Sequence, residues 1–157
     1  MTPAVDQLKK AKQDFQLLEY KSDPQQANFG QASAEKLGLA EELVFKTLVA
    51  CDDSNPKNMV VAIVPVSGQL DLKALAKAAS IKKMRMAEVP IAERTTGYVK
   101  GGISPFGQKK RLPTFIDSSA EQFAEVVVSA GKRGLSLQLK ASVLQTVLGA
   151  QFAKLSQ

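Results

Sequence analysis

The chain of 157 residues contains no histidine and a single cysteine. The absence of histidine excludes a Ser-His or Cys-His relay, a histidine-based metal site and the commonest general base in enzymes. One cysteine cannot form an internal disulfide, and the residues before Lys9 lack the apolar core of a signal peptide. No apolar run approaches the roughly 18 to 20 residues that a membrane span needs. We therefore expect a cytoplasmic protein without membrane association, whose chemistry proceeds without imidazole.

Acidic residues are outnumbered by basic ones, 15 against 21, which gives a formal net charge of +6. This balance favours a nucleic acid, a membrane surface or another polyanion as partner, and charge alone does not choose among them. Excess lysine also serves solubility, so the charge need not indicate a partner. Hydrophobic residues make up 45% and charged residues 23%, as in ordinary globular domains. A chain of this length buries roughly 70% of its unfolded surface. We predict a single domain that spans residues 1–157.

A glycine-rich, basic stretch, TTGYVKGGISPFGQKKR, runs from Thr95 to Arg111. Glycines permit positive φ angles and close approach of the backbone to a ligand, and the lysines at the end of the stretch add positive charge. This combination suits an anionic ligand lying against bare backbone. The alternative is a solvated surface loop with a basic end.

A second stretch, SAGKRGL from Ser129 to Leu135, again places glycines on both sides of a basic pair, Lys132 and Arg133. Two such stretches indicate a shared pocket more strongly than either does alone. Lys46 interrupts the apolar run VFKTLVA of residues 44–50, which is typical of a buried strand. A lysine there carries a desolvation cost unless it meets an anion, carbonyl groups or water. The alternative is an edge-strand lysine that guards against aggregation.

Periodicity and turn residues predict alternating helices and strands. Helices are expected from Thr2 to before Phe15 and over Gln31–Leu39, Leu70–Ala79, Glu88–Thr95 and Ala141–Leu148. Strands are expected over Phe15–Tyr20, Val44–Ala50, Met59–Val66, Ile81–Met86, Thr114–Ile116, Glu125–Ser129 and Leu135–Leu139. A loop is expected over Lys21–Gly30, and a hairpin-type loop over Asp52–Asn58. Ser118 or Ser119 is expected to cap a turn around Ala120–Phe123. Phe29 is either a plug over the core or a pocket wall, and Cys51 is interpreted as structural.

Three motifs together, FKTL at residues 45–48, the stretch from Thr95 and SAGKRGL from Ser129, resemble the YbaK family of bacterial aminoacyl-tRNA deacylases, specifically its Cys-tRNA(Pro) deacylase branch. The likeness extends from Thr2 to about Gly149. It implies a mixed α/β (α+β) fold, with a barrel-like central mixed β-sheet surrounded by helices, like the editing domain of prolyl-tRNA synthetase. It also implies trans-editing, the hydrolysis of the ester that joins a wrongly charged amino acid to the tRNA 3′ end.

The resemblance also implies a set of site residues. Lys46, Gly101 and Gly102 would be catalytic. The substrate would be bound by Tyr20, Phe29, Thr47, Tyr98, Ile103, Ser104, Ser129 and Gly131. One departure is that relatives often read Glu-Leu-Ala-Pro where this chain has Gln138, Leu139, Lys140 and Ala141, which puts any acidic group on that strand in doubt.

The expected chemistry agrees with these residue types, because backbone N–H groups beside glycines can meet the negative charge that ester cleavage builds. Lys46 would stabilise that charge or hold the terminal phosphate or ribose. The nucleophile is either water or the thiol of the substrate's own cysteine.

Basic side chains outside the pocket are expected to contact tRNA phosphates with little sequence readout. They are Lys82, Lys83, Lys109, Lys110, Lys132 and Arg133. The expected substrate is tRNA(Pro) charged with cysteine, with prolyl-tRNA synthetase as a partner by family likeness, and no metal or other cofactor is needed. The alternative is a non-catalytic module that binds the tRNA acceptor end. A nucleotide-phosphate hydrolase is disfavoured, because the sequence has no acidic cluster with metal-ligand spacing.

Overall fold

The computed structural model describes residues 2–22 and 29–157. Its helices are α1 (Pro3–Lys10), α2 (Phe29–Leu37), α3 (Leu72–Ala79), α4 (Val89–Thr96) and α5 (Ala141–Leu148), with 3-10 helices η1 (Glu41–Leu43) and η2 (Ser118–Gln122). Its strands are β1 (Gln16–Glu19), β2 (Phe45–Asp52), β3 (Asn55–Pro65), β4 (Met84–Met86), β5 (Thr114–Asp117), β6 (Val126–Lys132), β7 (Leu135–Leu139) and β8 (Gln151–Ala153). None of the helices in these ranges is long and apolar enough to cross a membrane.

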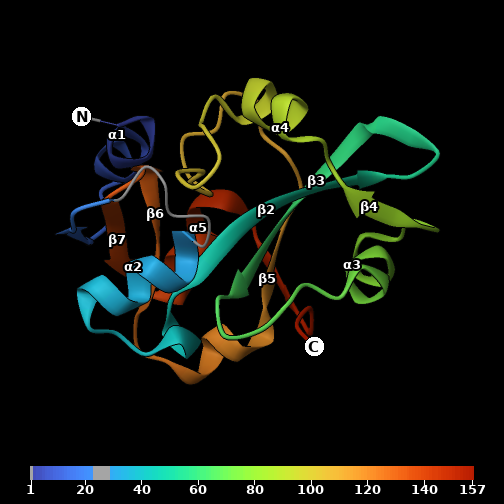
Figure 1. Ribbon diagram of the computed structural model, residues 1–157. Coiled ribbons are helices and arrows are strands. Elements are labelled where there is room, and N and C mark those ends of the chain that lie inside the picture. The colour runs from blue at the N-terminus through green and yellow to red at the C-terminus, as the bar shows by residue number, and fades with distance from the viewer. Residues whose placement is uncertain (1, 23–28) are drawn as a thin grey trace.

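Within the described ranges the strands form two sheets. The larger has the order β4-β2-β3-β5-β8, in which β2 pairs antiparallel with β3 and β4, while β5 pairs parallel with β3 and β8. The smaller has the order β1-β7-β6 and is antiparallel. Figure 1 shows β2 and β3 crossing the centre of the molecule, with β6 and β7 on one side and α3 and β4 on the other. The predicted mixed α/β class is confirmed.

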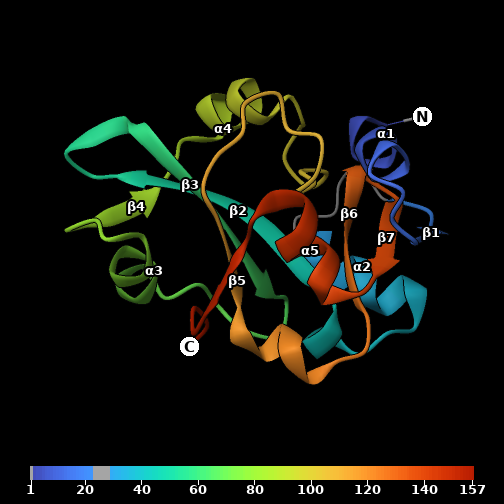
Figure 2. The same ribbon diagram turned by 180° about the vertical axis from the view of Figure 1, so that it is seen from behind.

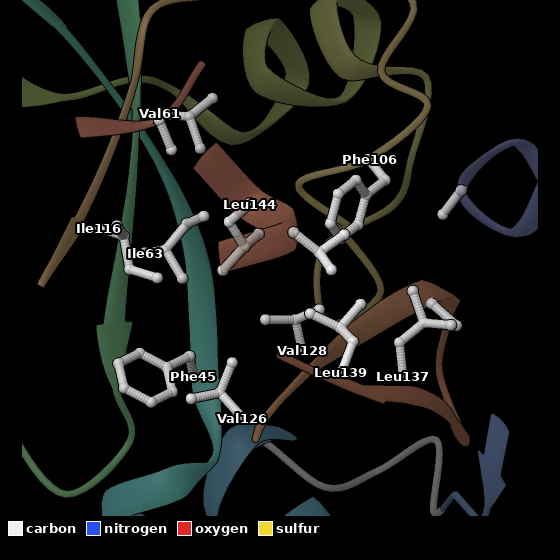
Figure 3. Close-up of a cluster of buried hydrophobic side chains, with 14 of the residues drawn as sticks. Phe45, Val61, Ile63, Phe106, Ile116, Val126, Val128, Leu137, Leu139 and Leu144 are labelled. Carbon is white, nitrogen blue, oxygen red and sulfur yellow. The ribbon is translucent and has the colours of Figure 1, made fainter. Parts of the chain in front are cut away.

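The main core fills the space between the two sheets (Figure 3). Phe45 and Ile63 come from the larger sheet, Val128 and Leu137 from the smaller, and Leu144 from α5. Figure 2 shows α5 between β5 and β6, so this helix covers the core from behind. Fully burying one such side chain contributes roughly 1.5 to 3 kcal/mol, so this cluster holds the two sheets together.

Local signals in the sequence explain where several helices begin and end. The Thr2 hydroxyl accepts a hydrogen bond from the Val5 N–H at 3.2 Å, and Pro3 occupies the first turn of α1. Asp71 caps α3 through the N–H groups of Lys73 and Ala74. Gly149, with φ +66°, ends α5 at the residue that the sequence predicts.

Other boundaries differ from the predictions. The hairpin predicted at Asp52–Asn58 is present but tighter than expected, because β3 already begins at Asn55 and the register shifts between Cys51 and Asp52. Phe29 opens α2 instead of lying in a loop, and residues 23–28 of that predicted loop lie outside the described residues. The strand β8 was not predicted.

The SAGKRGL stretch, in which only Ser129 and Leu135 were expected to belong to strands, is mostly strand. β6 continues to Lys132 through a register shift after Ser129, so the connection to β7 is only Arg133 and Gly134. Gly131, with φ +105°, absorbs the irregularity.

Asp117, and neither of the predicted serines, caps η2: its carboxylate accepts the Ser119 N–H at 3.3 Å and the Ser119 hydroxyl at 2.5 Å. Its other oxygen accepts the N–H groups of Leu155 and Ser156 at 2.8 and 2.9 Å. A single buried carboxylate therefore ties the C-terminal segment to the larger sheet.

Candidate active site

A cavity of about 390 Å³ opens where β2 meets the smaller sheet, α2 and the segment after α4. Its volume lies in the range of sites that bind small molecules. Predicted site residues that line it are Tyr20, Phe29, Lys46, Thr47, Gly101, Ile103 and Ser129. These residues come from five separate parts of the chain, so the sequence-distant stretches expected to share a pocket do so.

The cavity lies along an unpaired edge of β2. On this side β4 pairs only with Ala50–Asp52, and the Val49 carbonyl accepts the Ala87 N–H at 3.0 Å. At the other end, Val44 forms an isolated bridge with Val127 of β6. Between these attachments no described strand pairs with β2 on this side. Alternate residues of a strand direct their main-chain N–H and C=O groups to the same edge. The main-chain groups of Val49 face β4, so the main-chain groups of Thr47, two residues earlier, face the unpaired part of this edge.

Lys46 is half-buried in the cavity wall, and burial lowers the pKa of its amine from the ordinary value. Neither aspartate nor glutamate occurs among the residues that line the cavity in the described part of the chain. The amine therefore loses part of its hydration, and no carboxylate in the described wall compensates for that loss. Such a cation favours an anionic ligand, or a ligand on which negative charge develops.

Thr47 is buried, and its hydroxyl has no hydrogen-bond partner among the described residues. A buried hydroxyl without a partner costs about 1 to 3 kcal/mol. Since Thr47 also lines the cavity, a ligand or water in the cavity can satisfy this group.

The glycine stretch enters the wall as a tight turn. The Gly102 N–H donates to the Val99 carbonyl at 2.9 Å, and Gly101 has φ +86°, as the third residue of a type II turn requires. The Lys100 N–H donates to the Glu93 carboxylate at 2.9 Å, which fixes the turn to α4. Gly102 does not line the cavity and its N–H is engaged, so it is not placed to stabilise an oxyanion.

The N–H groups of Gly101 and Ile103 make no hydrogen bond within residues 2–22 and 29–157. Both residues line the cavity. Backbone N–H groups that lack internal partners are the donors that an oxyanion site uses. Gly101 and Ile103 therefore bring N–H groups without a described acceptor to the cavity, whereas Gly102 does not line it.

Three predicted substrate-binding residues lie behind the wall instead of in it. The Tyr98 hydroxyl donates to the Phe106 carbonyl at 2.6 Å, and burial raises the pKa of Tyr98 to about 12. The Ser104 hydroxyl is fully buried and accepts the Phe106 N–H at 3.2 Å. At Gly131 an added Cβ would come within 2.6 Å of the Tyr98 ring. The two hydrogen bonds brace the glycine stretch internally, and the close approach of Tyr98 to Gly131 packs it against the β6–β7 hairpin.

Residues 23–147 match the family described as the aminoacyl-tRNA editing domain. The chain belongs to this family. EbsC of Enterococcus faecalis, a proposed Cys-tRNA(Pro)/Cys-tRNA(Cys) deacylase, is 42% identical over 123 residues, which are 78% of this chain and 74% of that protein. The resemblance to the YbaK family is thereby confirmed.

Two solved structures share the fold of this editing domain. Hypothetical protein APE2540 superposes with a TM-score of 0.88 at 20% identity, covering 99% of this chain and 100% of that one. A proposed trans-editing enzyme for prolyl-tRNA synthetase superposes with a TM-score of 0.82 at 19% identity, covering 100% of this chain and 99% of that one. At these identities the likeness establishes the fold alone.

The basic residues predicted to contact phosphate are distributed around the editing domain. Lys82 and Lys83 are exposed in the connection between α3 and β4, on the other side of the molecule from β6 and β7 (Figure 1), and Lys83 lies 3.9 Å from Asp53. Lys109 and Lys110 are exposed beyond the glycine turn. Lys132 is exposed at the end of β6, next to Arg133. Phosphate binding by these residues stays a prediction.

Several cavity residues of the editing domain were not predicted. Ser136 lies opposite Ser129 in the β6–β7 register, so correct pairing of the hairpin would have identified it. Met86 and Ala87 reach the cavity because β4 pairs with β2, and Ser33 because α2 packs over the opening. Across the described residues, no group of three or more His, Cys, Asp or Glu is placed to hold a metal ion.

Proposed function

We propose that this editing domain is a trans-editing deacylase that hydrolyses the ester between cysteine and the 3′ end of tRNA(Pro). Family membership and the likeness to EbsC support the reaction and the substrate. The observation that carries the proposal is that Lys46, Gly101 and Ser129, from three distant segments, line one cavity of small-molecule size. The aminoacyl group occupies this cavity, and the rest of the tRNA lies outside it.

The polar groups of the cavity suit an ester whose carbonyl oxygen becomes negative. The unpaired N–H groups of Gly101 and Ile103 can donate to that oxygen, and Lys46 adds positive charge in a partly dehydrated wall. Donors of this kind stabilise a developing oxyanion more strongly than water does, because they need no reorientation during the reaction. In this proposal Thr47 supplies its buried hydroxyl to the bound amino acid.

In this proposal the nucleophile is either water or the thiol of the substrate's own cysteine, and the described lining residues include no carboxylate or imidazole to act as its general base. In the second route the cysteine sulfur attacks its own carbonyl carbon. A C–S bond then forms, the C–O bond to the ribose breaks, and the thiol proton passes to the ribose oxygen. The products are a cyclic thioester of cysteine, which water later opens, and uncharged tRNA.

A deacylation assay with Cys-tRNA(Pro) tests the reaction. The wild-type protein is expected to release cysteine with many turnovers, and Lys46→Ala is expected to lose most of this activity. Stoichiometric protection of the ester by the wild-type protein would overturn the proposal and establish a binding module instead.

A comparison of substrates tests the nucleophile. If the substrate thiol attacks, tRNA(Pro) charged with alanine or serine is cleaved far more slowly than Cys-tRNA(Pro), because neither side chain has a thiol. Equal turnover of the three would exclude the thiol route and leave water as the nucleophile.

Outside the cavity, exposed lysines bind the tRNA. Lys82, Lys83, Lys109, Lys110 and Lys132 contact phosphates, so affinity falls as salt concentration rises. Prolyl-tRNA synthetase supplies tRNA identity by family likeness, and the reaction takes place in the cytoplasm. Pull-down of the synthetase by this protein, with and without tRNA(Pro), tests the partnership.

A further inference from the structure

Three segments that are distant in the sequence meet at one side of the cavity. The guanidinium carbon of Arg133, in the β6–β7 turn, lies 4.4 Å from the centre of the Phe29 ring at the start of α2. The Arg133 Nε donates to the Lys100 carbonyl at 2.9 Å. One side chain therefore contacts both α2 and the glycine turn.

Gly101 is enclosed by the same contacts. An added Cβ at Gly101 would come within 2.7 Å of the Phe29 ring and 2.9 Å of the Arg133 Nε. The neighbouring Gly102 packs on the β6–β7 turn: a Cβ added at Gly102 would lie 3.0 to 3.1 Å from backbone atoms of Lys132 and Arg133. The position of the Gly101 backbone therefore depends on Arg133 and Phe29.

We propose that Arg133 is a positioning residue that clamps Phe29 and the Val99–Gly102 turn together and thereby fixes the Gly101 N–H in the cavity wall. This inference rests on the proposed deacylase function and replaces the prediction that Arg133 contacts tRNA phosphate. A planar guanidinium can stack on a ring with its face while it donates from its edge, whereas a lysine ammonium has no such face.

Lys132 provides a matched comparison in the same turn. It carries the same charge and is adjacent in the chain, but its side chain is exposed, and the contacts to the Phe29 ring and the Lys100 carbonyl belong to Arg133. Loss of Lys132 should weaken tRNA binding, and loss of Arg133 should disturb the geometry of the site. The loss of tRNA binding should appear in KM and in the salt dependence of binding, and the loss of site geometry should appear in kcat.

Steady-state kinetics of Arg133→Ala, Arg133→Lys and Lys132→Ala at several salt concentrations test the proposal. Arg133→Ala is expected to lower kcat by about 10- to 100-fold, the size of effect that a small misplacement in a site produces, with the salt dependence of binding unchanged. Arg133→Lys is expected to recover only part of this loss. Lys132→Ala is expected to raise KM and to reduce the slope of log K against log salt by about one. A reduced slope with unchanged kcat in Arg133→Ala would overturn the proposal.

Hydrogen exchange provides a readout that needs no activity. The N–H groups of Lys100 and Gly102 are hydrogen-bonded within the turn region, so they report its order. Their exchange is expected to accelerate in Arg133→Ala and Phe29→Ala, and to stay unchanged in Lys132→Ala. Unchanged exchange in Arg133→Ala, in a variant that retains the wild-type far-UV circular dichroism, would show that no clamp exists. If exchange is faster in Arg133→Ala but the wild-type protein does not deacylate Cys-tRNA(Pro), the deacylase proposal is wrong and the positioning role of Arg133 is still supported.

Discussion

Two regions of the larger sheet treat buried polar groups in opposite ways. At the β5–β8 side, both oxygens of Asp117 accept hydrogen bonds, from Ser119, Leu155 and Ser156. At the β2 edge, the Thr47 hydroxyl has no partner among the described residues, and Lys46 faces a cavity whose described wall contains no carboxylate. The first region gains stability from its polar groups. The second leaves them available to a ligand, at a cost in stability.

The largest expected effect concerns Lys46. Lys46→Met keeps the length of the side chain and removes the charge, so we expect deacylation to fall by about 100- to 1,000-fold, as when an oxyanion donor is lost. The free energy of unfolding should not fall, because a charge that is dehydrated in the folded state is removed. Activity on Cys-tRNA(Pro) and urea unfolding measure the two quantities.

Lys77→Met is the matched control, because Lys77 is exposed on α3. It should change neither quantity appreciably. Loss of stability in Lys46→Met would show that the β2 edge behaves like the Asp117 region.

The second prediction concerns Asp117 itself. Asp117→Ala leaves the N–H groups of Leu155 and Ser156 without their acceptor, and we expect a loss of about 2 to 4 kcal/mol in the free energy of unfolding. Asp53→Ala removes only exposed ion pairs, to Arg85 at 3.4 Å and Lys83 at 3.9 Å, and should cost less than about 1 kcal/mol. Urea unfolding measures both, and equal losses would remove the distinction between the anchored carboxylate and a surface one.

The third prediction is a pH dependence of stability. Burial by itself raises the pKa of the Asp117 carboxyl, but hydrogen bonds from Ser119, Leu155 and Ser156 outweigh it and hold the pKa below its ordinary value. The folded state therefore binds this proton more weakly than the unfolded chain does. The resulting stability is fully present above the unfolded pKa of about 3.9 and is lost as pH falls through the lower folded value.

Asp117→Asn should flatten this acid limb of the stability curve, measured by urea unfolding between about pH 5 and pH 2. An unchanged acid limb would mean that other carboxyl groups cause the loss. The wild-type protein measured in the same buffers is the reference.

The smallest expected effect compares two buried threonines. Thr47→Val removes a hydroxyl that no described residue partners and should raise the free energy of unfolding by about 1 kcal/mol. Thr114→Val removes a hydroxyl that donates to the Leu112 carbonyl at 3.0 Å and should lower it by about 1 kcal/mol. Changes of opposite sign in the free energy of unfolding, measured by urea unfolding, would support the contrast between the two threonines, and changes of the same sign would contradict it. In kinetics, only Thr47→Val should weaken turnover, by about tenfold if its hydroxyl bonds the substrate.

Much of the site could be predicted from the sequence because its signals are local or belong to a family motif. Lys46 stands out as a charge inside an apolar run, and the glycines of both stretches mark backbone that only glycine adopts, as the φ angles of Gly101 and Gly131 show. Gly102 and Ser104 share a motif with Gly101, but the turn and the core engage their polar groups. Sequence cannot separate neighbours in one loop by the direction in which each points.

The sequence by itself determined the alternation of helices and strands, the caps at Thr2 and Asp71, and the two glycine-bearing basic stretches, because these depend on periodicity and on contacts within a few residues. Only the tertiary structure decided that β2 has an open edge, that Arg133 stacks on Phe29, and that Asp117 holds the C-terminal segment. Each of these depends on sheet register and on packing between segments far apart in the chain. The short strand β8, which pairs with β5 at the end of the larger sheet, was missed for the same reason.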